Sequence, residues 1–448
     1  MELLDLVFRT KDLNGFPALG GALPLVGHMP YLYRGSRKVY RRAEAQLGPF
    51  FWLRNRPEEW SLQCAHPDGI AVLRTRSANV SHYKDIAGPL LGDSLLTHDG
   101  AKHTHERGAM NGPFTPRGLS AADVGPVIAD TIAKRVDLLK YRDTVRILAE
   151  TRELALDVIF GMIGIPARDL PEWRHHYEEY LLNAIGTPVD KLPGSPRWRG
   201  KRAQKWLDAK LMEAIREARR NPEAKGMLAH LVRAKDEHGE PLSDSEVLEN
   251  LRLVALAGHE TTATTMAWMV IELCQDRARW DRLVEEAKTA GDLPRTPADL
   301  SKFPYAEAVF REALRLHPPV PGVSRRVTGP LTIAGKDIPV GVEVTLLIDN
   351  IARNASLYPD PDAFKPERWL AKREPPSALD LSQFGGGVHF CIGYHVAWME
   401  SVVFIAALAK ALSERGAAPR FVTSYPSTFF MPLAHPDPKT MVRFAKVG

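Results

Sequence analysis

Cysteine is scarce in this chain of 448 residues, which contains three: Cys64, Cys274 and Cys391. They are too few and too far apart to form a disulfide framework, and no Cys-x-x-Cys pair is present to bind zinc. This scarcity excludes a disulfide-stabilised secreted scaffold and argues against a zinc site. A reducing compartment is the simplest environment for such a chain, so we predict a cytoplasmic protein.

Long apolar runs are also missing. The longest uninterrupted one, Val402–Ala409, is far shorter than the roughly 20 residues that a membrane-spanning helix needs. The first nine residues include Glu2, Asp5 and Arg9, and these charges do not fit a signal peptide or a membrane helix. We therefore predict a soluble protein with no membrane anchor.

The chain lacks a strong excess of one charge, because 59 Lys and Arg face 54 Asp and Glu, a formal net charge of +5. Zinc-finger, RNA-recognition and helix-turn-helix patterns are absent too, so no nucleic acid is expected as a partner. The basic residues are explained by a solvated surface or, alternatively, by a basic patch for an acidic partner protein. A hydrophobic content of 44% suffices for a large core.

What the chain does contain is mostly helical periodicity. We expect an irregular N-terminal segment over about residues 1–40 and a loop-like stretch over 78–100. Short strands are predicted at Phe50–Leu53 and Trp60–Cys64. Helices are predicted over 171–185 and 202–220, separated by a connector rich in proline and glycine.

The most informative stretch is a glycine-rich loop around a cysteine, Phe384-Gly-Gly-Gly-Val-His-Phe-Cys391-Ile-Gly393. An apolar, helix-like run follows over 394–412. A sulfur just before a helix start faces unpaired backbone N–H groups and the positive end of the helix dipole, and both favour the metal-binding thiolate. The glycines leave room for a flat cofactor, and the two phenylalanines can pack against an apolar macrocycle. We interpret Cys391 as the axial thiolate ligand of a haem iron.

This loop resembles the haem-binding signature of the cytochromes P-450, Phe-Gly-x-Gly-x-(Arg/His)-x-Cys-x-Gly-x-x-x-Ala-x-x-Glu. The matching positions are Phe384, Gly385, Gly387, His389, Cys391, Gly393, Ala397 and Glu400. The resemblance extends from roughly residue 20 to the end of the chain. It implies a mainly α protein with a small β-region, built as a single large triangular domain over 1–448 that binds haem b. Within that fold it implies lid helices over about 171–220 and a haem-binding loop over 384–393.

A long helix over about 243–275 has a polar middle. Ser243 and Glu246 form a capping-box pattern, and apolar residues follow with a helical period. The middle reads Ala257-Gly-His-Glu-Thr-Thr262, which conflicts with the burial expected of such a helix. Gly258 would let a ligand approach the backbone. The Thr261 hydroxyl can bond the carbonyl at 257 and open the hydrogen-bond ladder.

That segment is similar to the family's (Ala/Gly)-Gly-x-(Asp/Glu)-Thr-Thr oxygen-binding segment. The resemblance implies that Ala257 and Gly258 face the cofactor, and that Glu260 and Thr261 relay protons to dioxygen. A structural helix with back-bonded threonines is the alternative explanation. His259 falls at the variable position and is given no role.

Two further patterns match the family. Glu312-Ala-Leu-Arg315 is uninformative alone, but its continuation Leu316-His-Pro-Pro-Val-Pro321 is more specific, and Phe364-Lys-Pro-Glu-Arg368-Trp follows. The resemblance implies that Glu312, Arg315 and Arg368 form a structural network below the haem.

His103 and Arg107 stand four apart on a predicted helix and suit a carboxylate. They resemble the family's propionate-binding helix, although a surface helix of mixed charge is the alternative. Arg325 matches a further propionate position, and His389 stands where arginine is commoner. Trp398 occupies a position that is often arginine, which puts the details of partner docking in doubt.

The resemblance implies a soluble, bacterial-type haem-thiolate monooxygenase. Such an enzyme would insert one oxygen atom from O2 into an apolar small molecule, by hydroxylation or epoxidation. Electrons would come from NAD(P)H through a ferredoxin or flavodoxin and its reductase, with no fused reductase domain, and the protein would be a monomer. The alternatives are a peroxide-using or rearranging member of the family, against which the Glu260–Thr261 pair argues, and a haem protein that senses a gas. Substrate contacts are expected, by resemblance of position, at Ile86, Leu90, Leu91, Leu182, Val254, Val320, Val323 and Phe429.

Overall fold

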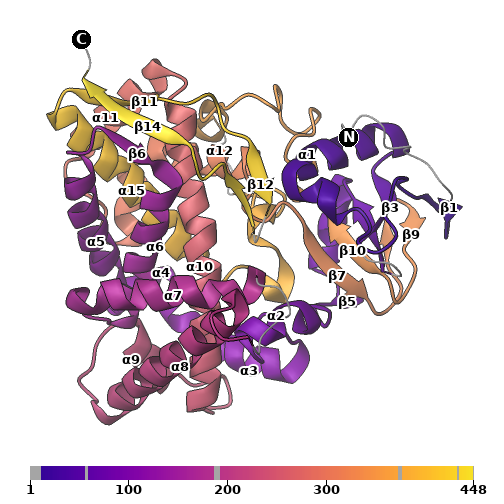
Figure 1. Ribbon diagram of the computed structural model, residues 1–448, viewed down its shortest axis with the longest axis horizontal. Coiled ribbons are helices and arrows are strands. Elements are labelled where there is room, and N and C mark those ends of the chain that lie inside the picture. Colours follow the sequence, from indigo (N-terminus) through magenta and orange to yellow (C-terminus); the bar gives the residue numbers. More distant parts are fainter. Residues whose placement is uncertain (1–11, 56–58, 186–191, 372–375, 431–432, 447–448) are drawn as a thin grey trace. The chain divides into compact units, whose positions relative to one another are not determined.

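The computed structural model describes residues 12–55, 59–185, 192–371, 376–430 and 433–446 (Figure 1). The chain divides into two compact units. The first, called the sheet unit here, comprises Met1–His82, Arg311–Cys391 and Pro426–Asp437. The second, the helical unit, comprises Tyr83–Phe310, Ile392–Tyr425 and Pro438–Gly448. The single domain expected over 1–448 stays a prediction.

The sheet unit contains a five-stranded sheet with the strand order β3-β4-β10-β7-β5. β10 runs parallel to β4, and the other neighbouring strands are antiparallel. Two strands, β3 and β4, are those predicted from the sequence. The elements of this unit are β1 (Asp12–Leu13), β2 (Phe16–Pro17), α1 (Met29–Leu47), β3 (Phe50–Arg54), β4 (Trp60–Cys64), η2 (Pro67–Leu73), β5 (Ala78–Asn79), β7 (Val323–Val327), β8 (Thr332–Ile333), β9 (Lys336–Asp337), β10 (Glu343–Leu346), α13 (Ile348–Ile351), α14 (Glu367–Leu370), η6 (Ser382–Phe384), η7 (Gly387–His389), β12 (Thr428–Phe430) and β13 (Ala434–Pro436).

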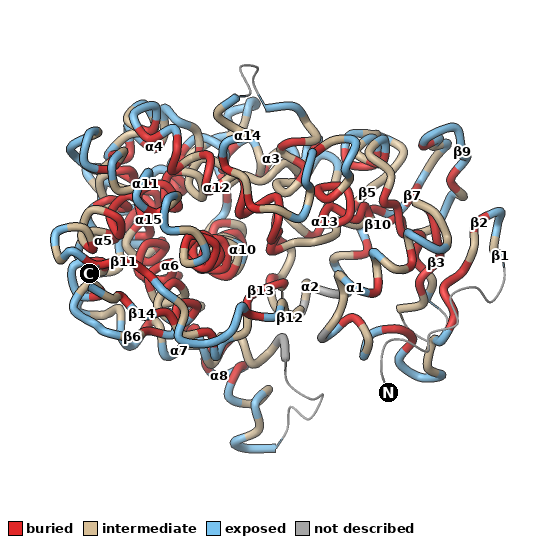
Figure 2. Tube along the Cα trace, turned by 90° about the horizontal axis from the view of Figure 1, so that it is seen from above, coloured by how far each residue is buried: buried red, intermediate tan, exposed pale blue. Residues whose placement is uncertain are grey.

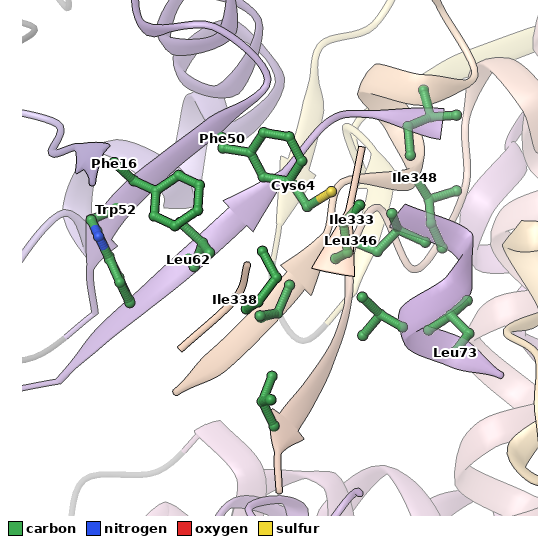
Figure 3. Close-up of a cluster of buried hydrophobic side chains, with 14 of the residues drawn as sticks. Phe16, Phe50, Trp52, Leu62, Cys64, Leu73, Ile333, Ile338, Leu346 and Ile348 are labelled. Carbon is green, nitrogen blue, oxygen red and sulfur yellow. The ribbon is translucent and has the colours of Figure 1, made fainter. Parts of the chain in front are cut away.

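The core of the sheet unit is a cluster of buried apolar side chains on this sheet (Figure 3). Leu62 of β4 pairs in register with Val344 of β10, and both are buried. The sulfur of Cys64, at the end of β4, lies inside the same cluster. Burial of such side chains stabilises a fold by roughly 1.5–3 kcal/mol each, so this cluster holds the sheet and η2 together.

The irregular N-terminal segment expected over 1–40 is wrong in its second half. Residues 1–11 lie outside the described part of the chain, but α1 begins at Met29. Pro30, one of the prolines on which the expectation of an irregular segment rested, lies in the first turn of α1. A proline is tolerated there because the first N–H groups of a helix have no intrahelical partner to lose.

The helical unit surrounds α10 (Asp244–Leu273), which is seen nearly end-on in Figure 2. Its other elements are α2 (Tyr83–Leu91), α3 (Gly100–Asn111), η3 (Gly112–Phe114), α4 (Pro116–Ala121), α5 (Val124–Leu139), β6 (Thr144–Arg146), α6 (Ile147–Ile163), η4 (Ala167–Asp169), α7 (Leu170–Ile185), α8 (Pro196–Arg220), α9 (Met227–Arg233), α11 (Arg277–Ala290), η5 (Pro297–Lys302), α15 (Tyr394–Glu414), β11 (Ala417–Phe421) and β14 (Met441–Lys446). The strands form a three-stranded sheet in the order β11-β14-β6. α12 (Pro304–Leu316) continues from this unit into the sheet unit.

The capping box predicted for the long helix is confirmed. The Ser243 side chain accepts the N–H of Glu246, and the Glu246 carboxylate accepts the N–H of Ser243 at 2.8 Å. The following run from Thr262 to Leu273 is buried at every position, because α6 and α15 pack against α10. A helix that is apolar all round needs such cover.

Two predictions about the helical unit fare differently. The paired helices expected over 171–220 are present as α7 and α8, which pack against each other. The loop-like stretch expected over 78–100 is wrong, because it includes α2 with Pro89 in its second half. The connecting residues 186–191 lie outside the described part of the chain.

The segment Gly387–Glu414, which includes α15, is long and apolar enough to cross a membrane by length and composition. Within the apolar 18-residue window of this segment, 72% of the residues are buried inside the protein. Eleven consecutive side chains, Met399 to Ala409, are buried. This is how the core helix of a folded protein is packed.

Candidate functional site

The cysteine loop is fixed by two short helices, η6 and η7, and by its own backbone hydrogen bonds. The N–H of Cys391 donates to the carbonyl of Phe384 at 2.8 Å, which closes the loop. The N–H of Phe390 donates to the carbonyl of Gly387 at 3.1 Å. Phe384 and Phe390 lie with their ring centroids 6.4 Å apart, so the two aromatic side chains flank the loop together.

The glycines of this loop are required by the loop itself. Gly385 and Gly387 have φ of 78° and 63°, a region that side-chain-bearing residues rarely adopt. A Cβ at Gly387 would lie 2.4 Å from the carbonyl oxygen of Leu73, and one at Gly386 would lie 3.0 Å from the Leu73 Cβ. Gly386 and Gly387 thus let the loop pack on η2, a reason that sequence analysis missed, while close approach of a flat cofactor to these glycines stays a prediction.

The three cysteines are thiols, and they differ in how readily they ionise. Burial raises the pKa of Cys64 to about 12, and its thiol lies 3.8 Å from the carbonyl of His66. Burial also raises the pKa of Cys274. Because a thiolate is the metal-binding form, these two are poor ligands at neutral pH. Cys391 is only partly buried.

Cys391 precedes the first turn of α15. Gly393 is the N-cap residue and has no side chain to accept the first N–H groups of the helix, while its carbonyl accepts the N–H of Ala397 at 2.9 Å. The positive end of this long helix is therefore next to Cys391 in the chain. Further along, burial raises the pKa of Glu400 well above its usual range, so this carboxyl group is neutral within the core.

An uncovered stripe runs along α10. Val254, Ala257, Gly258 and Thr261 are not buried, although most of their neighbours are, and their spacing puts them on one face of the helix. Thr261 Oγ1 donates to the carbonyl of Ala257 at 2.6 Å. α10 stays helical through this segment, so the expected opening of the hydrogen-bond ladder is not seen. The stripe is thus a part of α10 that its neighbouring helices leave uncovered.

Gly258 has a packing reason. A Cβ at this position would lie 3.2 Å from Cδ1 of Ile159 in α6. The glycine thus lets α6 approach α10 closely, a packing role that sequence analysis missed. Whether Gly258 also contacts a cofactor stays a prediction.

Glu260 is buried in α10 and paired with an arginine that sequence analysis missed. Arg152 of α6 donates from Nε to Glu260 Oε2 at 2.9 Å and from Nη2 to Oε1. No local signal could reveal this pair, because the partners are 108 residues apart. Beside it, burial lowers the pKa of His259 to about 4, so that this histidine is neutral at physiological pH.

Replacing Arg152 with leucine is expected to destabilise the fold by about 1–3 kcal/mol, because it leaves a buried carboxylate without its counter-charge. The estimate is below that for a fully buried pair, since 30% of the Arg152 side chain is exposed. Chemical denaturation would measure the loss. Adding Glu260→Gln should recover most of it, and Arg168→Leu, at a side chain that is 84% exposed, should change little. Equal losses from Arg152→Leu and Arg168→Leu would contradict the pairing.

Glu312, Arg315 and Arg368 are brought together in the sheet unit. Arg315 donates to both carboxylate oxygens of Glu312 at 2.9 and 2.8 Å, and Arg368 Nε donates to Glu312 Oε1 at 3.1 Å. Sequence analysis missed two further donors, the indole N–H of Trp369 and the backbone N–H of Lys365, both at 2.8 Å. Five donors thus converge on one buried carboxylate.

The predicted propionate residues lie in both units. His103 and Arg107 are one turn apart on α3, and His103 is buried. In the sheet unit, Arg325 is buried on β7 and donates to the carbonyl of Ser324 at 2.8 Å, and His389 ends η7. Their role with a cofactor stays a prediction.

The predicted substrate residues are also divided between the units. In the helical unit Leu90 and Leu91 end α2 and pack with Leu253 of α10, while Leu182 and Val254 are half-buried. The side chain of Ile86 lies outside the described part of the chain. In the sheet unit Val320, Val323 and Phe429 are half-buried, and the ring of Phe429 stacks on His435.

The chain belongs to the cytochrome P450 family, whose profile matches residues 17–413, and it is a haem monooxygenase of that family. It is 41% identical over 99% of its length to all of cytochrome P450 BJ-4 of Bradyrhizobium diazoefficiens. It is 31% identical to cyclooctat-9-en-7-ol 5-monooxygenase of Streptomyces melanosporofaciens, with 87% of each chain covered. Retinoic acid-bound cyanobacterial CYP120A1 shares the fold, with a TM-score of 0.81 at 24% identity over 95% of this chain and 98% of that one. The predicted family and fold class are confirmed.

Membership of the family implies a haem, and the residues present fit one. The donor set is a single partly buried thiol beside a helix N-terminus, while the other two thiols have raised pKa values. No group of three or more His, Cys, Asp and Glu side chains that could hold a metal ion occurs among the described residues. A haem iron needs one protein ligand of this kind, because the porphyrin supplies the others.

Proposed function

We propose that this protein inserts one oxygen atom from O2 into an apolar small-molecule substrate, by hydroxylation or epoxidation, at a haem b ligated by Cys391. Electrons come from NAD(P)H through a ferredoxin or flavodoxin and its reductase. The observation that carries the proposal is the Glu260–Thr261 pair in the middle of α10, with Thr261 on the uncovered stripe. A relative named as a monooxygenase supports the same reaction class.

Each part of the chain has a role in this proposal. When bound, a thiolate-ligated haem supplies the oxygen-activating chemistry. The Cys391 thiolate holds the iron, and His103, Arg107, Arg325 and His389 bind the propionates. Phe384, Gly385, Gly393 and Ala397 shape the loop around the ligand, while Ala257 and Gly258 face the distal side.

Proton delivery belongs to Glu260 and Thr261. The Glu260 carboxylate is buried and held by Arg152, whose partly exposed guanidinium connects it to solvent. Thr261 Oγ1 donates its proton to the carbonyl of Ala257. The lone pairs of Oγ1 remain able to accept a hydrogen bond from another group. The Glu260 carboxylate would first take up a proton from solvent and would be ionised again once it passes this proton on. On the uncovered face of α10 the Thr261 hydroxyl would accept the hydrogen bond of the group that carries the proton.

The substrate is proposed to be apolar because the residues predicted to contact it are apolar. They are Leu90, Leu91, Leu182, Val254, Val320, Val323 and Phe429. The protein would work in the cytoplasm, which fits thiol rather than disulfide cysteines, and it would be a monomer.

Oxygen-18 labelling tests the proposed reaction. The purified haem-loaded protein is first screened for apolar compounds that shift its absorption spectrum. The compounds that bind are then turned over with NADPH, a ferredoxin and its reductase under 18O2. We expect products that contain one labelled atom. Products without label, or turnover that needs only hydrogen peroxide, would instead identify a rearranging or peroxide-using member, and no turnover would favour a gas sensor.

Replacing Thr261 with alanine is expected to keep haem and substrate binding but to divert electrons to hydrogen peroxide. Product formed per NADPH should fall on the order of 10²-fold, the lower end of what a positioned proton-transfer group contributes. Product and peroxide are measured in the same reaction. Thr264→Val is the matched control, because the Thr264 hydroxyl is fully buried and without a hydrogen-bond partner among the described residues. Unchanged coupling in Thr261→Ala would refute the relay.

A further inference from the structure

A buried polar cluster joins three segments of the helical unit. These are the loop between α2 and α3, residues 92–99, and the helices α3 and α10. At its centre Glu106 of α3 is 0% exposed and Asn250 of α10 is 1% exposed. The Asn250 amide donates from Nδ2 to Glu106 Oε2 at 2.8 Å, and its Oδ1 accepts the backbone N–H of Leu95 at 3.0 Å. Asn250 therefore holds the 92–99 loop and Glu106 at the same time.

The second oxygen of Glu106 faces a histidine. Oε1 has no hydrogen-bond partner among the described residues, and His98 Nε2 lies 3.4 Å from it. The other ring nitrogen of His98, Nδ1, lies 3.5 Å from Oδ1 of Asp93, a side chain that is 40% exposed. Lys102 Nζ donates to Asp93 Oδ2. The cluster is thus a row from buried carboxyl to imidazole to solvent-accessible carboxylate.

Burial, more than the charges around it, favours the neutral form of Glu106. Lys102 lies on its own helix, with Nζ 3.9 Å from Oε1, whereas Asp93 of the loop and Glu246 of α10 contribute negative charge. Burial raises the pKa of Glu106 to about 7, against the bond from Asn250 and the charge of Lys102. Burial, with the charge of Lys102, lowers the pKa of His98, while Asp93 and Asp99 oppose this. Near neutral pH Glu106 therefore exchanges its proton beside a neutral imidazole.

We propose that Glu106 is a proton-operated positioning residue that holds the 92–99 loop against α10. With the proton present, Glu106 Oε1–H donates to His98 Nε2, and His98 Nδ1–H donates to Asp93, so each member of the row has a partner. When the proton leaves through His98 to solvent, a buried carboxylate remains with one firm donor, Asn250. Solvation of that charge then favours a loosened loop.

The direction follows from linkage. The closed loop binds the proton more tightly than a loosened, solvated one, so a rise in pH through about 7 shifts the equilibrium toward the loosened form. The loop follows α2 directly and contains Leu95 and Leu96. These two leucines belong to one apolar cluster with Leu90 and Leu91 of α2 and Leu253 of α10. A consequence for substrate affinity rests on the function proposed above, in which Leu90 and Leu91 contact substrate; the loop transition itself does not.

Hydrogen exchange of the Leu95 amide in the full-length protein tests the proposal without any substrate. Protection relative to the intrinsic rate should fall about tenfold between about pH 6 and about pH 8 and then level off. The midpoint of the whole fall lies below 7, between the Glu106 pKa values of the loosened and the closed loop. Glu106→Gln, whose amide reproduces the protonated carboxyl, should give a flat and protected profile. Glu213→Gln, at a carboxylate of α8 whose side chain is 70% exposed, is the control and should keep the midpoint.

A second variant keeps Glu106 in place. His98→Ala removes the acceptor of the Glu106 proton, so the midpoint should move to lower pH. Protection of Leu95 that does not depend on pH in the wild type, or an unchanged midpoint in Glu106→Gln, would overturn the proposal. A normal Leu95 transition together with absent monooxygenase turnover would leave the loop proposal standing and refute only the proposed reaction.

Discussion

Replacing Cys391 with histidine is expected to remove the thiolate signature of the haem protein. The variant can still hold haem through the imidazole, but its reduced carbon monoxide complex should lose the red-shifted Soret band typical of thiolate ligation. Product formation should fall to background, because the electron-rich sulfur is what favours O–O cleavage. Absorption spectra of the reduced, carbon monoxide-treated proteins make the measurement.

The other two cysteines provide the controls for this experiment. Cys64→Ser and Cys274→Ser should keep the red-shifted band, since burial raises the pKa of both thiols. Cys64→Ala is a second control at this position. Cys64 lies in the apolar core of the sheet unit, where a serine hydroxyl is less suitable than a methyl group (Figure 3). Loss of the band in either control with retention in Cys391→His would assign the ligand to a different cysteine.

Sequence signals were reliable where the cause is local. The capping box of α10 depends on two residues three positions apart, and both hydrogen bonds are present. The strand Trp60–Cys64 and the helix after Gly393 also have the starts predicted for them. In each case the residues that decide the structure are neighbours in the chain.

The sequence was least informative where hydrogen-bonding partners are far apart in the chain, or where one residue type has several structural roles. Arg152 could not be linked to Glu260, and Trp369 could not be linked to Glu312, without the packing that brings them together. Glycine is ambiguous because it permits ligand approach, positive φ and close helix packing alike. At Gly258 and Gly387 the structure shows close packing against Ile159 and Leu73, which the sequence did not reveal.

Proline caused the clearest error. Pro30 and Pro89 were interpreted as marks of irregular backbone, yet they lie in α1 and α2. Pro30 is in the first turn of its helix, where no hydrogen bond is lost. A periodic pattern that begins one residue before a proline therefore predicts a helix start rather than a loop, and this would have corrected residues 29–40.

Replacing Arg315 with methionine is expected to destabilise the sheet unit by about 3–5 kcal/mol, the cost of breaking a buried ion pair from one side. Arg315 is 0% exposed. Besides Glu312 it donates to the carbonyls of Ala352 and Pro361, both at 2.7 Å, and to that of Ala363 at 3.1 Å. The substitution removes all of these bonds and leaves the Glu312 carboxylate with Arg368 as its remaining cation.

Denaturant unfolding of the full chain, with haem content measured alongside, would separate this network from ordinary arginine contacts. Arg326→Met, at an exposed neighbour on β7 with one carbonyl bond at 3.1 Å, should cost no more than about 0.5 kcal/mol. The double variant Glu312→Gln/Arg315→Met should be less unstable than Arg315→Met, because the unpaired buried charge is gone. A single variant no less stable than Arg326→Met would show that these contacts do not hold the unit together. A double variant that is worse than the single one would show that hydrogen bonds from Trp369 and Lys365 to the ionised carboxylate, rather than the ion pair, are the larger contribution.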